Sequence, residues 1–308
     1  MRLLILIILI SISIGCSPKV KQATEDTMSS VSLHETLSYQ DTVDSLRQVR
    51  LDRLTSPQGW LSVVGLHWLD QGINSIGAAD DNTIQFPSIT TETIGAYQVD
   101  GDQIFFGKVE GVDVQSGGTE FMGGPIEVSI PPTILNHGPL YWYLLNRGGK
   151  YGIRLKDTTA SNRINFKGLD YFEISDKYKI EAKVLEPLNT DSIAITNVIG
   201  QVTNFPVEAY LNFEIAERVY DLVALDNGDQ TYFVIFDDLT SGDTTYGGGR
   251  FLYPDKPCDT CAQVTQLDFN LAQNPPCAFT DFATCPLPPM PNKLKFGIKA
   301  GEKNASNH

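Results

Sequence analysis

Hydrophobic and polar positions alternate over most of this chain in short runs typical of β-strands. From about residue 57 onward the runs are rich in β-branched and aromatic residues, and turn-forming residues separate them. Four of these turns predict hairpins: Asp70–Gly72, Asp100–Asp102, Arg147–Lys150 and Asp226–Asp229. We therefore predict an all-β fold of two packed sandwich- or barrel-like sheets or subdomains, with one N-terminal amphipathic helix.

The helix is predicted over residues 32–56, which contain no Pro or Gly. Apolar side chains recur there at near-helical spacing, at Leu33, Leu37, Val43, Leu46 and Val49. We expect this helix to pack as a strap on the β body. The body divides into an N-terminal half, 57–165, and a C-terminal half, 166–303, followed by a short tail, 304–308.

Residues 1–16 have the pattern of an export signal. One charged residue, Arg2, precedes an apolar run that is shorter than the roughly 20 residues of a spanning helix. The run ends in Ser13–Cys16, which resembles a bacterial lipobox, so we expect lipidation at Cys16 and a flexible tether over 17–31. Cleavage without lipidation and an uncleaved anchor are the alternatives. We expect a protein exported to the bacterial cell envelope and lipid-anchored at its periplasmic or surface face.

Composition and net charge limit the classes of molecule that the protein can be expected to bind. Of 308 residues, 42% are hydrophobic and 19% charged, which is typical of a globular chain with a sizeable core. The formal net charge of -14 argues against nucleic acid or an anionic membrane surface as partner. Neutral and cationic ligands remain compatible with it.

Four cysteines follow Cys16: Cys258, Cys261, Cys277 and Cys285. In an exported protein these predict disulfides, with several possible connectivities, and a Cys277–Cys285 bridge would close a small loop. A zinc site and a nucleophilic thiol are the alternatives, but only the first pair has the spacing of a zinc knuckle. A thiol nucleophile needs a basic partner, and the chain has four histidines. We predict no metal and no cofactor.

The last quarter of the chain, residues 236–303, is densest in groups that carry chemistry, and we name it the C-terminal motif. Its first part leaves a predicted buried strand, Tyr232–Phe236, and enters a polar, glycine-rich loop. This loop either caps itself through Asp and Thr side chains or presents Asp237, Thr244 and Tyr246 to a ligand, with Arg250 aimed at an anionic group.

The second part of the motif allows two interpretations. On a strand, Asp268 and Asn270 would share one face, and after a Pro-rich segment Leu294, Phe296 and Ile298 alternate as a last strand. In one interpretation this is a rigid crossing segment whose Asn and Asp side chains replace missing backbone partners. In the other, the polar residues converge on one cavity as catalytic carboxylates and ligand-binding groups. The catalytic candidates are Asp237, Asp268 and Glu302, and the ligand-binding candidates are Thr244, Tyr246, Arg250, Asn270 and Asn274.

Two resemblances to known families follow from these residues. Part of the N-terminal half resembles the opening strands of a forkhead-associated domain, which implies a β-sandwich. Phosphothreonine recognition does not carry over, because Ala78 stands where that family has an Arg. The residues carrying this resemblance are Trp68–Leu69, Gly72, Ile76–Gly77, Ile84–Pro87 and Gly95.

The C-terminal motif resembles the bacterial domain-of-unknown-function family 1684. The resemblance covers roughly residues 50–303 and implies no established activity, substrate or cofactor. In that family's pattern Cys258 and Cys261 are additions. The segments that carry it are Gly59–Leu61, Gly65–Leu66, Trp68–Leu69, Gly152–Arg154 with Asp157, Thr245–Leu252, Leu267–Asn270, Asn274–Phe279, Cys285–Pro289, Asn292 and Ala300–Lys303.

The sequence as a whole predicts an envelope lipoprotein that binds a small molecule or glycan, or serves a structural role, through a polar pocket formed by the C-terminal motif. The alternative is a metal-independent hydrolase that uses paired carboxylates. An exposed aromatic platform from Trp60, Trp68 or Trp142 would favour glycan or peptide binding.

Overall fold

The computed structural model describes residues 38–188, 191–215 and 217–305. The predicted signal, the lipidation site Cys16, the tether and the first residues of the predicted helix lie outside the described residues. Among the described residues, no helix is long and apolar enough to cross a membrane.

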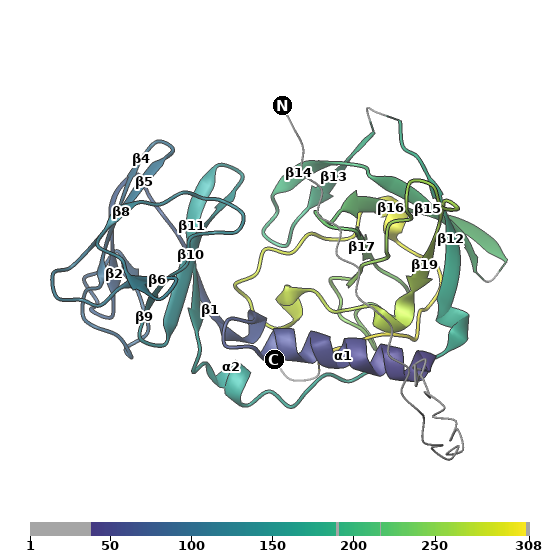
Figure 1. Cartoon of the computed structure of the whole chain (residues 1–308), viewed down its shortest axis with the longest axis horizontal. Coiled ribbons are helices and arrows are strands. Elements are labelled where there is room, and N and C mark those ends of the chain that lie inside the picture. Colours follow the sequence, from purple (N-terminus) through teal and green to yellow (C-terminus); the bar gives the residue numbers. More distant parts are fainter. Residues whose placement is uncertain (1–37, 189–190, 216, 306–308) are drawn as a thin grey trace, which may run out of the picture. The chain divides into compact units, whose positions relative to one another are not determined.

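Two sheets build the N-terminal half (Figure 1). All pairs of neighbouring strands are antiparallel except β2 with β3. The six-stranded sheet has the order β1 (Val63–Trp68), β11 (Lys150–Asp157), β10 (Leu140–Arg147), β9 (Leu135–His137), β6 (Gln115–Ser116) and β7 (Thr119–Glu120). The five-stranded sheet has the order β3 (Ile84–Gln85), β2 (Gly72–Gly77), β4 (Gly95–Asp100), β5 (Gln103–Lys108) and β8 (Gly124–Pro125).

The core of this half is built around Trp142 on β10. Its side chain is fully buried, and its indole N–H donates to the hydroxyl of Tyr97 at 2.9 Å. Phe86 and Phe106 meet its ring edge-on, an arrangement that aromatic quadrupoles favour. Trp142 is therefore a core residue and contributes to no exposed aromatic platform.

A second six-stranded sheet and a two-stranded ribbon build the C-terminal half. The sheet has the order β18 (Arg250–Leu252), β17 (Tyr232–Phe236), β16 (Arg218–Asp226), β15 (Ala209–Ile215), β12 (Lys179–Leu185) and β19 (Val264–Asp268), and the ribbon pairs β13 (Ser192–Thr196) with β14 (Val202–Pro206). The short helices of the two halves are α2 (Ser161–Ile164) and the 3-10 turns at Trp60–Ser62, Asp176–Tyr178, Phe269–Leu271, Pro276–Ala278 and Met290–Asn292.

The predicted all-β fold with one N-terminal helix is confirmed, and so are three of the four hairpins. Asp100–Asp102, Arg147–Lys150 and Asp226–Asp229 each join neighbouring antiparallel strands. The hairpin at Asp70–Gly72 was wrong, because β1 and β2 belong to different sheets. The buried Asn74 side chain binds the backbone N–H and C=O of Asp70, at 2.9 and 2.8 Å, and fixes the turn between the two sheets.

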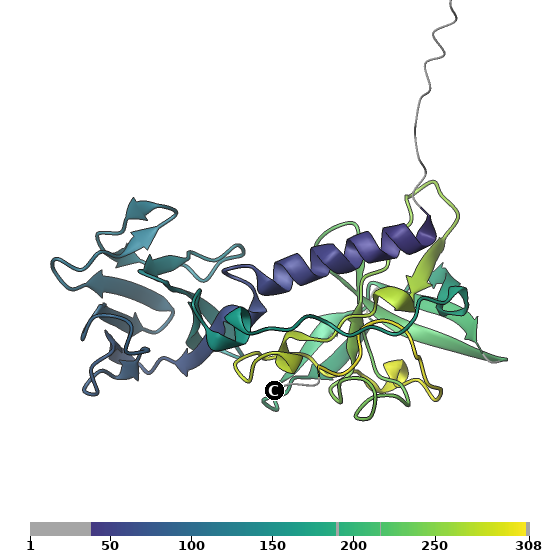
Figure 2. The ribbon, with the colours of Figure 1, turned by 90° about the horizontal axis from the view of Figure 1, so that it is seen from below.

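Helix α1 (Tyr39–Thr55) begins with a capping box between Ser38 and Asp41 and runs along the C-terminal half (Figure 2). Of the apolar positions predicted for its buried face, Val43 was right, Leu46 and Val49 were wrong, and Leu33 and Leu37 lie outside the described residues. Leu46 and Val49 are 45% and 42% exposed, whereas Val43 and Leu54 are buried. The side chains that contact the body are Tyr39, Val43, Arg47, Arg50 and Leu54, which recur at the spacing of one helical face.

Polar contacts hold this face to the body. The Tyr39 hydroxyl donates to the Asp268 carboxylate at 2.8 Å, and Arg47 donates to the carbonyl oxygens of Phe172 and Asn270. Arg50 Nε donates to Glu302 Oε1 at 2.9 Å. The helix is therefore attached through charged and polar groups that reach into the body.

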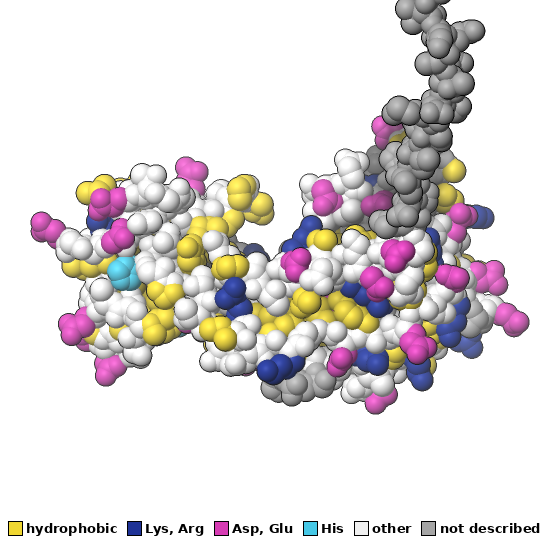
Figure 3. Space-filling view, turned by 60° about the horizontal axis from the view of Figure 1, so that its bottom comes forward, with side chains coloured by type: hydrophobic (Ala, Val, Ile, Leu, Met, Phe, Trp, Pro, Cys, Tyr) yellow, Lys and Arg dark blue, Asp and Glu magenta, His cyan; other side chains and the backbone are white. Residues whose placement is uncertain are grey.

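Acidic side chains are spread over the molecular face shown in Figure 3, in keeping with the formal net charge of -14. Two basic residues of the described chain are buried, Arg154 and Arg250. Arg250 pairs with Asp238, as the partly buried Arg50 does with Glu302, whereas Arg154 pairs with no carboxylate of the described chain.

We predict that Arg50→Ala destabilises the protein far more than Arg53→Ala on the exposed side of the same helix. Loss of Arg50 leaves the Glu302 carboxylate, which has no exposed surface, without its cation, an effect of about 3–5 kcal/mol. Arg53 is exposed, so its removal should change the free energy of unfolding by less than about 0.5 kcal/mol. Urea denaturation of both variants measures the difference, and equal losses would contradict this role for Arg50.

Candidate functional site

The centre of the C-terminal motif is a buried ion pair between Arg250 and Asp238. Arg250 Nη2 donates to Asp238 Oδ2 at 2.7 Å, and both side chains have no exposed surface. The guanidinium also donates to the carbonyl oxygens of Ile298 and Ala300. Burial lowers the pKa of Arg250, and the Asp238 carboxylate opposes that shift. The sequence predicted that Arg250 binds a ligand. In the structure the Arg250 side chain instead binds backbone carbonyl oxygens of the chain itself.

Asp238 completes the same network from the other side. Its Oδ1 accepts hydrogen bonds from the Thr240 N–H and hydroxyl, at 2.9 and 2.7 Å, and from the Ile298 N–H at 3.0 Å. A carboxylate with this many donors is well satisfied although it is buried. It holds the loop after β17 against the end of the motif.

Glu302 has a similar role beside it. Its Oε2 accepts from the Asn274 N–H at 2.7 Å while Oε1 accepts from Arg50. Asn274 in turn donates from its side chain to the Lys303 carbonyl oxygen at 2.7 Å. Gly301, the residue before Glu302, has φ +75°. A Cβ atom at this position would lie 2.6 Å from the Ala272 carbonyl oxygen. Only glycine fits this close approach of two backbone segments.

The remaining candidates are also engaged within the fold. β19 ends at Asp268, so Asp268 and Asn270 do not share a strand face; Asp268 Oδ1 instead accepts from the Asn270 side chain at 3.0 Å. Asn270 is buried and binds both polar backbone groups of Ser175. Asp237 Oδ2 lies 3.7 Å from Lys293 Nζ, and burial raises the pKa of the Asp237 carboxyl group.

The predicted last strand over 294–298 was wrong, although its burial pattern was right. Leu294 and Ile298 are buried, but the chain there is irregular. Side chains take the place of strand neighbours: Asn292 bonds with the backbone of Val223 and Ile235, at 2.7–2.9 Å. Of the two interpretations offered by the sequence, the geometry fits the rigid crossing segment.

The four cysteines, whose connectivity the sequence left open, pair as Cys258–Cys261 and Cys277–Cys285. The second closes a small loop, and Cys285 is buried beneath the ribbon of β13 and β14. Within the described residues, no group of three or more His, Cys, Asp or Glu side chains could hold a metal ion.

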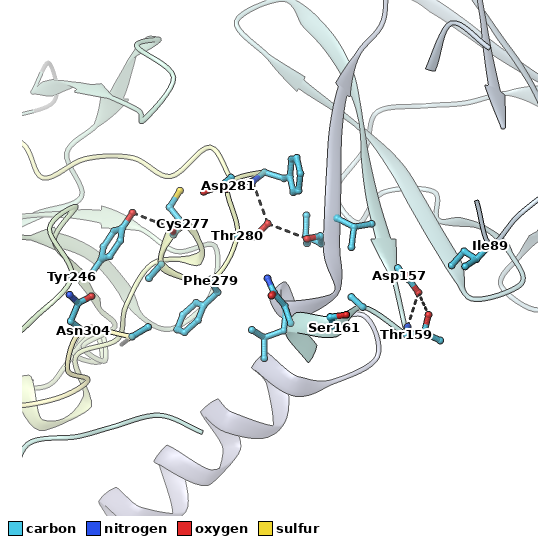
Figure 4. A pocket seen from close by; sticks show the side chains of 18 residues that line it. Ile89, Asp157, Thr159, Ser161, Tyr246, Cys277, Phe279, Thr280, Asp281 and Asn304 are labelled. Atoms are coloured by element: carbon cyan, nitrogen blue, oxygen red, sulfur yellow. Dashed lines mark hydrogen bonds between the residues drawn. The ribbon is translucent and has the colours of Figure 1, made fainter. Parts of the chain in front are cut away.

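The motif does line a cavity, at a place the sequence analysis did not single out. The cavity has a volume of about 790 Å³ and lies between the loop closed by Cys277–Cys285 and the end of β11 (Figure 4). Tyr246, Phe279 and Asn304 form one side, while Asp157, Ser161 and Ile89 form the other. The remaining lining residues are Leu61, Val63, Val64, Thr159, Ala160, Asn162, Cys277, Ala278, Thr280, Asp281, Phe282 and Ala305.

Some of the polar side chains in this lining are held by hydrogen bonds within the protein, and others are free to bind a ligand. The Tyr246 hydroxyl donates to the Cys277 carbonyl oxygen, Thr280 donates to the Val63 carbonyl oxygen, and Asp157 accepts two bonds from Thr159 at 2.7 Å. In contrast, the side chains of Ser161, Asn162, Asp281 and Asn304 are exposed and form no hydrogen bond with the described chain. Burial and the nearby Asp281 carboxylate raise the pKa of Tyr246, so its hydroxyl stays protonated.

Among the five ligand-binding candidates from the sequence, Tyr246 lines this cavity, whereas Thr244, Arg250, Asn270 and Asn274 do not. The catalytic candidates Asp237, Asp268 and Glu302 do not line it either. Sequence reasoning missed Asp157, Ser161, Asn162, Asp281 and Asn304 as site residues. For Asp281 the available signal was the Cys277–Cys285 pair, because a small closed loop presents the residues between its cysteines, whereas the other four residues come from distant segments and carried no local signal.

We predict that Arg250→Met lowers the free energy of unfolding by about 3–5 kcal/mol, because it leaves Asp238 buried without its cation. Asp238→Asn in the same chain should recover part of that loss, so the two effects will be far from additive. Arg218→Met, at an exposed position on β16, is the matched control. Urea denaturation of Arg250→Met, Asp238→Asn, the double variant and the Arg218→Met control measures the coupling, and strictly additive losses from the two single changes would show that the pair does not act as a unit.

Comparison with known proteins identifies one family. The model of the family described as Protein of unknown function (DUF1684) matches residues 164–303. The uncharacterised protein from gene locus rrnAC0354 of Haloarcula marismortui, solved by NMR, is 33% identical, with 47% of this chain and 81% of that chain covered and a TM-score of 0.40.

A structure titled as the FhaA FHA domain complexed with the intracellular domain of Rv3910 is 12% identical. The alignment covers 30% of this chain and 97% of that chain, with a TM-score of 0.22, which is too low to establish a shared fold. No curated protein matches the chain. Through residues 164–303, the chain belongs to the DUF1684 family of proteins of unknown function.

Proposed function

We propose that this protein is a lipid-anchored binding protein of the bacterial cell envelope that holds a neutral, hydroxyl-rich small molecule, such as a short glycan, in the cavity beside Tyr246. The observation that carries the proposal is the lining of that cavity. Its volume, about 790 Å³, falls within the range of roughly 300–1,000 Å³ that is usual for small-molecule sites.

The chemistry of the lining favours a sugar over other small molecules. Ser161, Asn162 and Asn304 offer uncommitted hydroxyl and amide groups, and Asp281 offers a carboxylate that accepts hydrogen bonds from hydroxyls. Phe282 and Ile89, which are 38% and 50% exposed, supply apolar surface for the C–H faces of a ring. The result is a mixed polar and apolar wall, as sugar rings require.

Charge argues against an acidic ligand in this cavity. Its lining contains the carboxylates of Asp157 and Asp281 and, among the described residues, no Lys, Arg or His. An anion would meet like charge there, whereas a neutral or amino sugar would not. This agrees with the acidic composition of the whole chain.

We predict that a neutral or amino sugar binds the full-length chain and that Asp281→Asn weakens its binding about tenfold or more, because a hydrogen bond to a charged acceptor is lost. Asn304→Ala should weaken it less. Isothermal titration against a panel of neutral, amino and acidic sugars measures the affinities. The matched controls are Asp259→Asn and Asn165→Ala, at exposed positions outside the cavity. Equal binding by Asp281→Asn and the parent would refute the site.

We also predict that Cys16→Ser moves the protein from the membrane fraction to the soluble fraction of the cell envelope. A lipid chain on Cys16 is the anchor in this proposal, and a polar tether follows it in the sequence. Fractionation after labelling with a radioactive fatty acid measures both incorporation and location. Ser17→Ala is the neighbouring control, and incorporation of the fatty acid retained by Cys16→Ser would exclude Cys16 as the lipidated residue.

A further inference from the structure

Three cations, Arg147, Arg154 and Lys156, belong to strands β10 and β11 of the six-stranded sheet in the N-terminal half. Figure 1 shows these two strands side by side. Arg154 and Lys156 are alternate residues of β11, so their side chains share one face of the sheet. Arg147 is at the end of β10, which pairs with β11. Arg147 Nε donates to Thr284 Oγ1 at 3.2 Å, so a residue of the C-terminal motif borders the cluster.

Arg154 is the unusual member. Its residue is 4% exposed, and its guanidinium lies 4.9 Å from the centre of the Trp60 ring. Nη1 donates to the Tyr143 hydroxyl at 3.3 Å, but Nε and Nη2 are buried without any hydrogen-bond partner. These two nitrogens form one edge of the guanidinium, and their N–H bonds point in the same direction. A buried donor pair of this kind is strongly unfavourable unless something accepts from it.

No carboxylate balances the cluster. Arg147, Arg154 and Lys156 form no ion pair with any carboxylate of the described chain, in contrast to Arg250 with Asp238 and Arg50 with Glu302. Burial, with the neighbouring charge of Arg154, lowers the pKa of Lys156 to about 8. Burial and Arg154 also lower the pKa of Arg147. The charge of Arg154 therefore repels those of Lys156 and Arg147, in a chain whose formal net charge is -14.

We propose that Arg154, Lys156 and Arg147 bind an oxyanion, a phosphate or carboxylate group that the free edge of Arg154 holds through two parallel hydrogen bonds. The two oxygens of such a group match the spacing of Nε and Nη2, which is the geometry by which arginine recognises carboxylate and phosphate. Lys156 and Arg147 add positive charge on the same face of the sheet. This site is separate in chemistry from the cavity beside Tyr246, whose lining carries carboxylates.

The test is thermal unfolding of the full-length chain in inorganic phosphate, in acetate and in sodium chloride, all at matched ionic strength. We expect phosphate or acetate to raise the melting temperature saturably, by on the order of 5 °C near saturation, above the effect of chloride. The anion that acts at lower concentration identifies the group. If neither exceeds chloride, the cluster binds no oxyanion and the proposal is overturned.

Three variants assign the effect to the cluster. Arg154→Met keeps the side-chain length, removes the unpaired charge, and should abolish the response while melting at or above the parent without anion. Arg154→Lys keeps the charge but loses the paired donors, so we expect affinity to fall about tenfold or more, and it replaces Arg154→Met if that variant does not fold. Lys156→Gln should weaken binding several-fold.

The matched control is Arg218→Gln on β16, which is exposed and outside the cluster. It should respond to the anion as the parent does. A full anion response retained by both Arg154 variants would place the effect elsewhere and overturn the proposal. Because the probes are simple anions, this outcome does not depend on whether a sugar binds the cavity.

Discussion

The C-terminal half depends on one constraint: a long irregular segment is buried, and its backbone must find hydrogen-bond partners without a strand beside it. Arg250 and Asp238 meet that need at the centre, since the guanidinium binds two carbonyl oxygens and the carboxylate binds two N–H groups. The attraction between their opposite charges offsets the cost of burying each one. The density of Asp, Asn, Arg and Gly in this motif is explained by that requirement.

Glu302 links this buried segment to helix α1 by hydrogen bonds to both. One carboxylate oxygen binds the Asn274 backbone inside the motif and the other binds Arg50 from the helix. Arg50 also donates to the Asn274 carbonyl oxygen at 3.0 Å. Helix and motif therefore complete one polar network, which is why a helix with few apolar residues on its buried face is held in place.

Scaffold and candidate site are adjacent in this arrangement. Tyr246 follows the loop that Asp238 anchors, and the cavity-lining residues Thr280 and Asp281 lie in the loop closed by Cys277–Cys285. Of these residues, Asp281 has an exposed side chain that forms no hydrogen bond with the described chain, so the rigid loop presents it to the cavity. The two proposed sites differ in the sign of their charge. Carboxylates line the cavity, whereas the cluster around Arg154 consists of cations without carboxylate partners. A ligand for one is electrostatically unsuited to the other.

The sequence by itself determined the all-β class, the helix, three hairpins and the family, because periodicity, turn residues and short motifs are local properties. Tertiary structure decided which helix face is buried, since Arg47 and Arg50 find partners in the body and Leu46 and Val49 do not. It also decided that Arg250 and Glu302 are structural, because pairing depends on residues distant in the chain. The cavity and the unpaired edge of Arg154 arise where separate segments meet, and no local pattern encodes such a meeting.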